Sequence, residues 1–110
     1  MNISSREVGD AIVVMVEGNL DTNTSPDAQN YLDQLVNSGT QKILISFEST
    51  NYVSSAGLRV VLATAKLLNK NGGDLRLCNL SATVHDVFEI SGFTTILNVF
   101  DSEKEAIEGF

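Results

Sequence analysis

The sequence is poor in the residues on which covalent and metal-bound scaffolds depend: its 110 residues include one cysteine, Cys78, and one histidine, His85. A lone cysteine excludes an internal disulfide framework and a zinc cluster. No apolar run approaches the roughly 18–20 residues that span a bilayer. The first ten residues, MNISSREVGD, lack the basic-then-apolar order of a secretory signal. We therefore expect a cytoplasmic protein.

Basic residues are also scarce. The chain has 7 lysines and arginines against 14 aspartates and glutamates, which gives a formal net charge of -7. Because an acidic surface offers few favourable contacts to phosphates, we expect neither nucleic acid nor a membrane surface as a partner. Hydrophobic residues make up 43% of the chain, enough for one buried core at this length. Residues 1–110 are therefore expected to form a single domain.

Motifs for nucleotide binding and catalysis are absent. The chain has no GxxxxGK[ST] loop and no GxGxxG after a predicted strand, and Gly72-Gly73 indicates a turn. The segment VSSAG is not the GxSxG of a hydrolase, and His85 is expected on the exposed face of its helix. Asp86 and Glu89 share that helix, but nothing in the sequence shows them converging with a histidine on a metal. We expect no enzyme, no cofactor and, at Cys78, a buried inert thiol.

The periodicity of the apolar residues alternates between that of strands and that of helices. The predicted strands are 3–8, 11–17, 42–47, 75–78 and 95–100; the predicted helices begin at Ser25-Pro26, Ala56, Ser81 and Ser102. The segment 48–53 is predicted as a loop. The order ββαβαβαβα predicts a single α/β domain with a mixed, mostly parallel β-sheet and an N-terminal β-hairpin.

In such sheets the functional surface lies beyond the carboxyl ends of the strands. Three predicted loops should gather there: 18–25, 47–56 and 79–81. The middle loop ends in two adjacent serines, Ser54 and Ser55, followed by Ala56 and Gly57. This loop is therefore the first place to look for a site.

Two interpretations of the serine pair remain open. Either serine could cap the following helix, which is worth about 1 kcal/mol, but a cap needs only one hydroxyl. Gly57 is an odd choice within a first turn, since glycine costs close to 1 kcal/mol relative to alanine in a helix. Because Ala56 and Gly57 have small side chains, they would leave the first helical turn uncovered. Another molecule could then reach the hydroxyl of Ser55 and the helix amides.

Two motifs and the order of elements resemble the STAS domain family, and in particular bacterial anti-sigma factor antagonists. Members of the family carry a G-x-L-D loop after the second strand and a D-S-[ST]-G-L type motif at the start of the second helix. The first matches residues 18–21, within GNLDTNTS; the second matches residues 54–58, within YVSSAGLRVVL. The resemblance covers essentially the whole chain. It implies that Ser55 is the phosphorylated serine and that Ser54 stands where an aspartate is frequent.

The resemblance also implies a partner-switching cycle. The unphosphorylated protein would bind an anti-sigma factor that is also an ATP-dependent serine kinase, and so free the sigma factor. Phosphorylation of Ser55 would end that complex, and a PP2C-type phosphatase would restore it. The chain would be a substrate and a binding module with no catalysis of its own.

The residues expected to bind the partner lie around Ser55. They are Asp21, Thr22, Thr24, Asn51, Ser54, Gly57 and Arg59. Asp21 could instead be an Asx-turn residue. Val60 and Leu67 could form either an apolar contact patch or the margin of the core.

Two rival functions remain. The chain could be a STAS scaffold or ligand-sensing module that is never phosphorylated, within a signalling or lipid-transport complex, with Ser55 as a simple cap. Ser54 in place of aspartate favours this rival, since serine cannot supply a charge to present the hydroxyl. A small hydrolase that uses Ser55 would lack a base.

Overall fold

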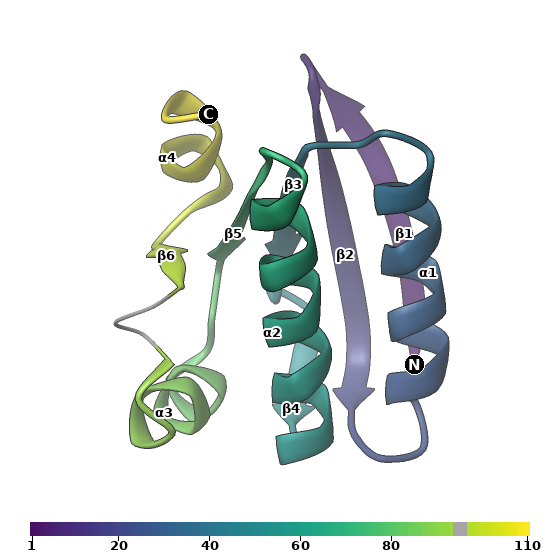
Figure 1. Ribbon diagram of the computed structural model, residues 1–110. Coiled ribbons are helices and arrows are strands. Elements are labelled where there is room, and N and C mark those ends of the chain that lie inside the picture. Colours follow the sequence, from purple (N-terminus) through teal and green to yellow (C-terminus); the bar gives the residue numbers. More distant parts are fainter. Residues whose placement is uncertain (94–96) are drawn as a thin grey trace.

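The computed structural model describes residues 1–93 and 97–110, and shows strands and helices that alternate along the chain (Figure 1). The strands are β1 (Asn2–Val8), β2 (Ala11–Leu20), β3 (Lys42–Ser46), β4 (Thr50–Val53), β5 (Asp74–Cys78) and β6 (Asn98–Phe100). The helices are α1 (Ser25–Asn37), α2 (Ser55–Lys70), α3 (Ala82–Ile90) and α4 (Glu103–Glu108). None of these helices combines the length and apolar composition needed to cross a membrane.

The strands form one mixed sheet in the order β1-β2-β3-β5-β6, with β4 paired to the end of β2. β1 and β2 form the antiparallel hairpin, and the other pairs are parallel. The predicted fold class is therefore confirmed: an α/β domain with a mostly parallel sheet and an N-terminal hairpin.

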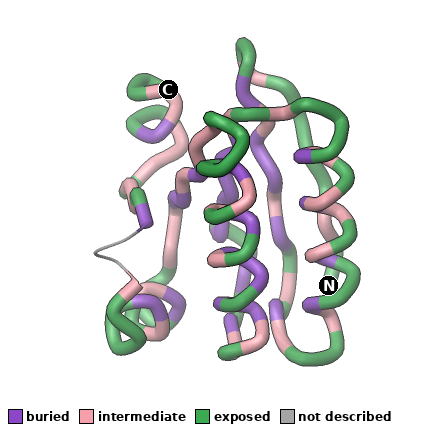
Figure 2. Tube along the Cα trace, viewed as in Figure 1, coloured by how far each residue is buried: buried purple, intermediate pink, exposed green. Residues whose placement is uncertain are grey.

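The side chains of each central strand alternate between two hydrophobic clusters, as the pleat of a strand requires. Val14 and Ile45 belong to the larger cluster, which also contains the buried faces of α1 and α2. Their neighbours Val13 and Leu44 face the other side and pack against α4. Figure 2 shows the buried positions gathered where the helices meet the sheet, with exposed positions on the outer helix faces.

The prediction of a loop over residues 48–53 is wrong, because Thr50–Val53 is the strand β4. Its register places Leu20 opposite Val53, and the Thr50 hydroxyl donates a hydrogen bond to the carbonyl of Val16 (2.6 Å). The sequence did not predict this strand because most residues of the segment are polar, which is typical of a loop. The observed order is therefore ββαββαβαβα.

The helix boundaries agree with their predicted capping residues, with one shift. Ser81 and Ser102 are N-caps whose hydroxyls accept from the amides of Val84 and Glu105 (both 3.2 Å). Ser25 is the first residue of α1, and the N-cap position belongs to Thr24, whose side chain makes no capping hydrogen bond.

The predicted last strand, 95–100, is observed as Asn98–Phe100. Residues 95 and 96 lie outside the described residues.

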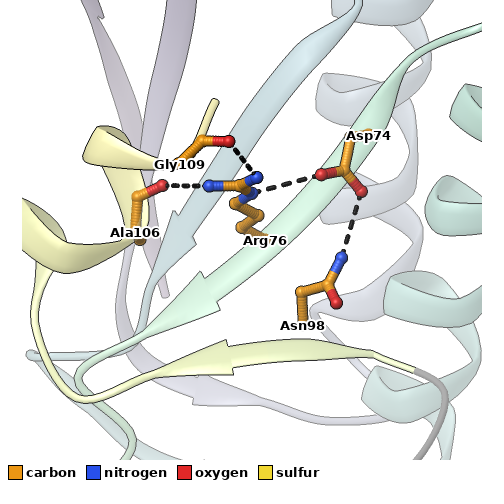
Figure 3. A network of polar contacts seen from close by, with 5 residues as sticks. All are labelled: Asp74, Arg76, Asn98, Ala106 and Gly109. Atoms are coloured by element: carbon orange, nitrogen blue, oxygen red, sulfur yellow. Dashed lines mark hydrogen bonds and ion pairs between the residues drawn. The ribbon is translucent and has the colours of Figure 1, made fainter.

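Arg76 on β5 contacts the C-terminal helix α4 (Figure 3), and Arg6 on β1 pairs with Glu103 of the same helix. Arg76 donates hydrogen bonds to the carbonyls of Ala106 (2.7 Å) and Gly109, and pairs with Asp74 (3.1 Å). Its guanidinium lies 4.2 Å from the centroid of the Phe110 ring, a cation–π distance. The carbonyls at the end of α4, which the helix itself cannot satisfy, thus find a charged donor.

Candidate functional site

The pairing of β2 with β4 brings the two sequence motifs together. Leu20 and Val53 are opposite each other, and the amide of Ser54 donates to the carbonyl of Leu20 (2.9 Å). Asp21 and Ser54 are therefore the next residues beyond a paired position. The start of α1, the start of α2 and α3 gather at this end of the molecule, at the bottom of Figure 1.

The two serines have different positions in α2. Ser54 is the N-cap, and its hydroxyl accepts from the amide of Gly57 (3.4 Å). Ser55 is the first residue of the helix and is exposed. Within the described part of the chain its hydroxyl makes no side-chain hydrogen bond. Of the two predicted candidates for the cap, the structure therefore selects Ser54, which leaves the hydroxyl of Ser55 available.

Gly57 is buried, and its missing side chain faces the inside of the protein. A Cβ there would lie 2.7 Å from the carbonyl oxygen of Leu20 and 3.0 Å from Cγ1 of Val53. The expectation that Gly57 bares the first turn for an incoming molecule is thus wrong. Its position does not support the predicted part in partner binding, and its lack of a side chain lets α2 approach the ends of β2 and β4.

The loop between β2 and α1 is organised by Asp21. Its Oδ1 accepts hydrogen bonds from the amides of Asn23 (3.0 Å) and Thr24 (3.2 Å), which is an Asx turn. The Thr24 hydroxyl accepts from the amide of Asp21 and donates to the carbonyl of Asn19, both at 2.9 Å. Asp21 and Thr24 are therefore partly committed to the loop, whereas Thr22 is exposed.

The remaining predicted contact residues lie at the surface. Asn51 on β4 and Arg59 on α2 are exposed. Val60 is 5% exposed and belongs to the core, and Leu67 packs against the core at its margin.

Tyr52 was missed by the sequence prediction. It is 47% exposed, which makes it one of the few large hydrophobic side chains open to solvent in the described residues. It lies on β4, two residues before Ser54, and an exposed aromatic beside such a site is a common protein contact. The only signal in the sequence was a tyrosine inside an otherwise polar segment.

His85 pairs with a carboxylate on its own helix. Its Nδ1 lies 3.3 Å from Oε2 of Glu89, and ligand atoms of His85, Asp86 and Glu89 all lie within 4.8 Å of one another. A histidine does converge with these carboxylates, contrary to the sequence-based expectation. The His85–Glu89 contact, one turn apart on a solvated helix face, accounts for their proximity.

Cys78 is fully buried, as predicted. Burial raises the pKa of its thiol to about 11, with a smaller opposing effect from a hydrogen bond with Ser46. At neutral pH the side chain is a protonated, inaccessible thiol, which is a poor nucleophile.

Two open hollows lie at the opposite end of the sheet. One, of about 300 Å³, is lined by residues that include Asp10, Gly39 and Lys42; the other, of about 250 Å³, is lined by residues that include Gly73, Arg76 and Phe110. Neither is lined by Asp21, Ser54 or Ser55. The exposed side chains of the candidate site, Ser55 among them, suit contact with another protein.

Comparison with known proteins shows the family of the chain. The model of the STAS domain family matches residues 2–106. A Bordetella bronchiseptica protein, BtrV, provisionally named an anti-sigma factor antagonist, is 33% identical over 110 residues, which are 100% of this chain and 95% of that protein. The anti-sigma-B factor antagonist of Staphylococcus aureus is 30% identical over 90% of this chain and 92% of its own length. The phosphorylated form of the Bacillus cell fate determinant SpoIIAA has a similar structure, with a TM-score of 0.76 and 25% identity over 97% of each chain.

Proposed function

Because the chain belongs to the STAS domain family, we propose that it acts as an anti-sigma factor antagonist. Its unphosphorylated form binds an anti-sigma factor that is also a serine kinase, and so frees the sigma factor. The kinase transfers the γ-phosphoryl group of ATP to the Ser55 oxygen, which loses its proton, and ADP leaves. A PP2C-type phosphatase later hydrolyses the phosphoserine. The cycle takes place in the cytoplasm, and the chain is a substrate throughout.

The main support for this proposal is that the two serines have different structural roles. Ser54 caps α2 through the amide of Gly57, so Ser55 is not needed as a cap. The exposed hydroxyl of Ser55 stands at the first helical position. A phosphate there lies at the positive end of the helix dipole, near amides that lack intrahelical partners. Phosphorylation is therefore compatible with the folded helix.

The relatives support the same function. The Staphylococcus aureus relative is named as an antagonist of an anti-sigma factor, and the SpoIIAA structure has a phosphorylated form. Both cover at least nine tenths of the present chain. The proposal therefore applies to the whole domain.

Electrostatics can account for the release of the partner. A phosphate adds about -1.5 to -2 charges at pH 7. Against one like charge ~5 Å away, at an effective dielectric constant of ~20, each added unit costs roughly 3 kcal/mol. Since 1.4 kcal/mol is tenfold in affinity, one such contact weakens binding about a hundredfold. No change of fold is needed.

The proposed partner surface is centred on Ser55. Its proposed members are exposed side chains: Thr22 on the loop after β2, Asn51 and Tyr52 on β4, and Arg59 one turn along α2. Asp21 shapes this surface by holding the loop. Tyr52 supplies apolar contact area, and Arg59 supplies a charge for a carboxylate.

A comparative capture experiment tests the proposal. Wild type, Ser55→Asp and Ser4→Asp are used as baits in a lysate of the source cells, and captured proteins are identified by mass spectrometry. Ser4 is an exposed serine on β1, so its variant adds the same charge away from the site. We expect wild type and Ser4→Asp to capture a serine kinase-like ATPase that Ser55→Asp loses. An identical set of proteins on all three baits would favour the scaffold function.

A further inference from the structure

The exposed face of α2 carries an unusual concentration of positive charge. The helix, SAGLRVVLATAKLLNK, has three basic residues and no acidic residue, although acidic residues outnumber basic ones two to one in the chain. Arg59, Ala63, Lys66 and Lys70 are all exposed. With 3.6 residues per turn, these four positions fall within about 60° of one another around the helix axis. We call them the α2 basic stripe.

The three charges of the stripe differ from the paired cations of the sheet. Arg6, Lys42 and Arg76 pair with Glu103, Asp10 and Asp74. Arg59, Lys66 and Lys70 make no ion pair with any residue that the structure describes. Carboxylates three or four residues away on the same helix would pair with such side chains, and α2 has none. These three side chains are therefore available to a carboxylate from outside the chain.

The surroundings limit what can bind there. The neighbouring helix α1 carries Asp27 and Asp33 and no basic residue, and the chain as a whole has a net charge of -7. A broad polyanion such as a nucleic acid duplex or an anionic membrane would meet these charges and be repelled. A single acidic segment fits the stripe, because it can follow α2 without covering α1.

We propose that the α2 basic stripe is a docking surface for an acidic segment of a partner protein. Arg59 to Lys70 spans eleven residues of helix, or ~16 Å at 1.5 Å per residue. An extended segment of about five residues covers that length. The small side chain of Ala63 lets the segment approach the helix between Arg59 and Lys66.

The stripe is adjacent to Ser55 but separate from it. Ser55 stands four residues before Arg59, so a phosphate on Ser55 would compete with the docked segment for that arginine. This consequence rests on the proposed function. The docking surface itself does not, since Lys66 and Lys70 lie two or more turns away.

NMR titration of the ¹⁵N-labelled full chain tests the docking surface. The probe is a short peptide of glutamate and serine, and its matched control is the same peptide with lysine in place of glutamate. We expect shifts confined to the surface of α2 with the glutamate peptide only. Lys66→Glu should weaken binding about fivefold, as removing one exposed pair and creating one repulsion implies. Lys104→Glu, at an exposed lysine on α4 without an ion pair in the described structure, should leave the affinity unchanged.

Three outcomes would overturn the proposal. Shifts spread over all the cations, Lys104 included, would mean diffuse attraction. Equal weakening by Lys66→Glu and Lys104→Glu would mean that only net charge matters. Equal or tighter binding of single-stranded DNA or of phosphatidylserine vesicles at the same ionic strength would identify a different occupant. The two glutamate variants lie on exposed helix faces, so both are expected to fold, which circular dichroism checks.

Discussion

The carbonyl oxygen of Leu20 lies where a side chain on Gly57 would have to go: a Cβ on Gly57 would stand 2.7 Å from it. The same carbonyl accepts the hydrogen bond of the Ser54 amide. The end of β2 and the start of α2 are thus in direct contact. This contact places the loop that follows β2 beside the serine pair.

Gly57→Ala should destabilise the protein although alanine favours helices. The gain in propensity is about 1 kcal/mol, but the obstacle is a backbone oxygen, so relief requires α2 to move. We expect a net loss of about 1–3 kcal/mol in the free energy of unfolding, as for other overpacked sites. Urea denaturation measures it. Ala63→Gly, at an exposed position of the same helix, serves as the control for propensity alone.

Ser54→Ala and Ser55→Ala should affect stability differently. Ser54→Ala removes the cap and should cost about 1 kcal/mol. Ser55→Ala removes an exposed hydroxyl that makes no side-chain hydrogen bond in the described structure, so the free energy of unfolding should change by less than about 0.5 kcal/mol. Chemical denaturation of the two variants side by side decides the matter. Equal losses would mean that the serines share the capping role.

Asp21 can be tested by separating its charge from its hydrogen bonds. Asp21→Ala removes the acceptor for two amides and should cost about 1–2 kcal/mol. Asp21→Asn retains an acceptor oxygen and should stay close to wild type in stability. If both variants bind the captured partner as wild type does, Asp21 is a turn residue only. If Asp21→Asn alone weakens binding without loss of stability, its charge contacts the partner.

Cys78 should make stability depend on pH above neutrality. In the folded protein the pKa of the Cys78 thiol is about 11, above the value of 9.0 for an exposed cysteine, because the side chain is buried. The folded state therefore holds the proton more tightly. The stabilisation is fully present below pH 9 and is lost as the pH rises to 11, by about 2–3 kcal/mol in total. Denaturation between pH 8 and 11 should show a smaller pH dependence for Cys78→Ala than for wild type.

Much of the fold could be predicted because apolar periodicity reflects burial. Val13 and Val14, adjacent on β2, pack on opposite faces of the sheet, and the buried stripe of α2 follows helical spacing. Polar signals at helix starts identified Ser81 and Ser102 correctly. These are local properties that neighbouring residues determine.

What could not be predicted depends on contacts between distant residues. β4 is a strand because Thr50 and Val53 meet β2 more than thirty residues away in the chain, and its own composition is that of a loop. The reason for Gly57 lies in the position of the Leu20 carbonyl. For the site, the motif predicted Ser55, but only the helix boundary showed which serine is the cap.

Phosphosite mapping tests the central claim most directly. Wild type, Ser54→Ala and Ser55→Ala are incubated with ATP and the serine kinase-like ATPase recovered by capture, and the modified residue is located by tandem mass spectrometry. The account predicts phosphate on Ser55 in wild type and in Ser54→Ala, and none in Ser55→Ala. Phosphate on Ser54 or Thr22, or continued modification of Ser55→Ala at the wild-type rate, would contradict it.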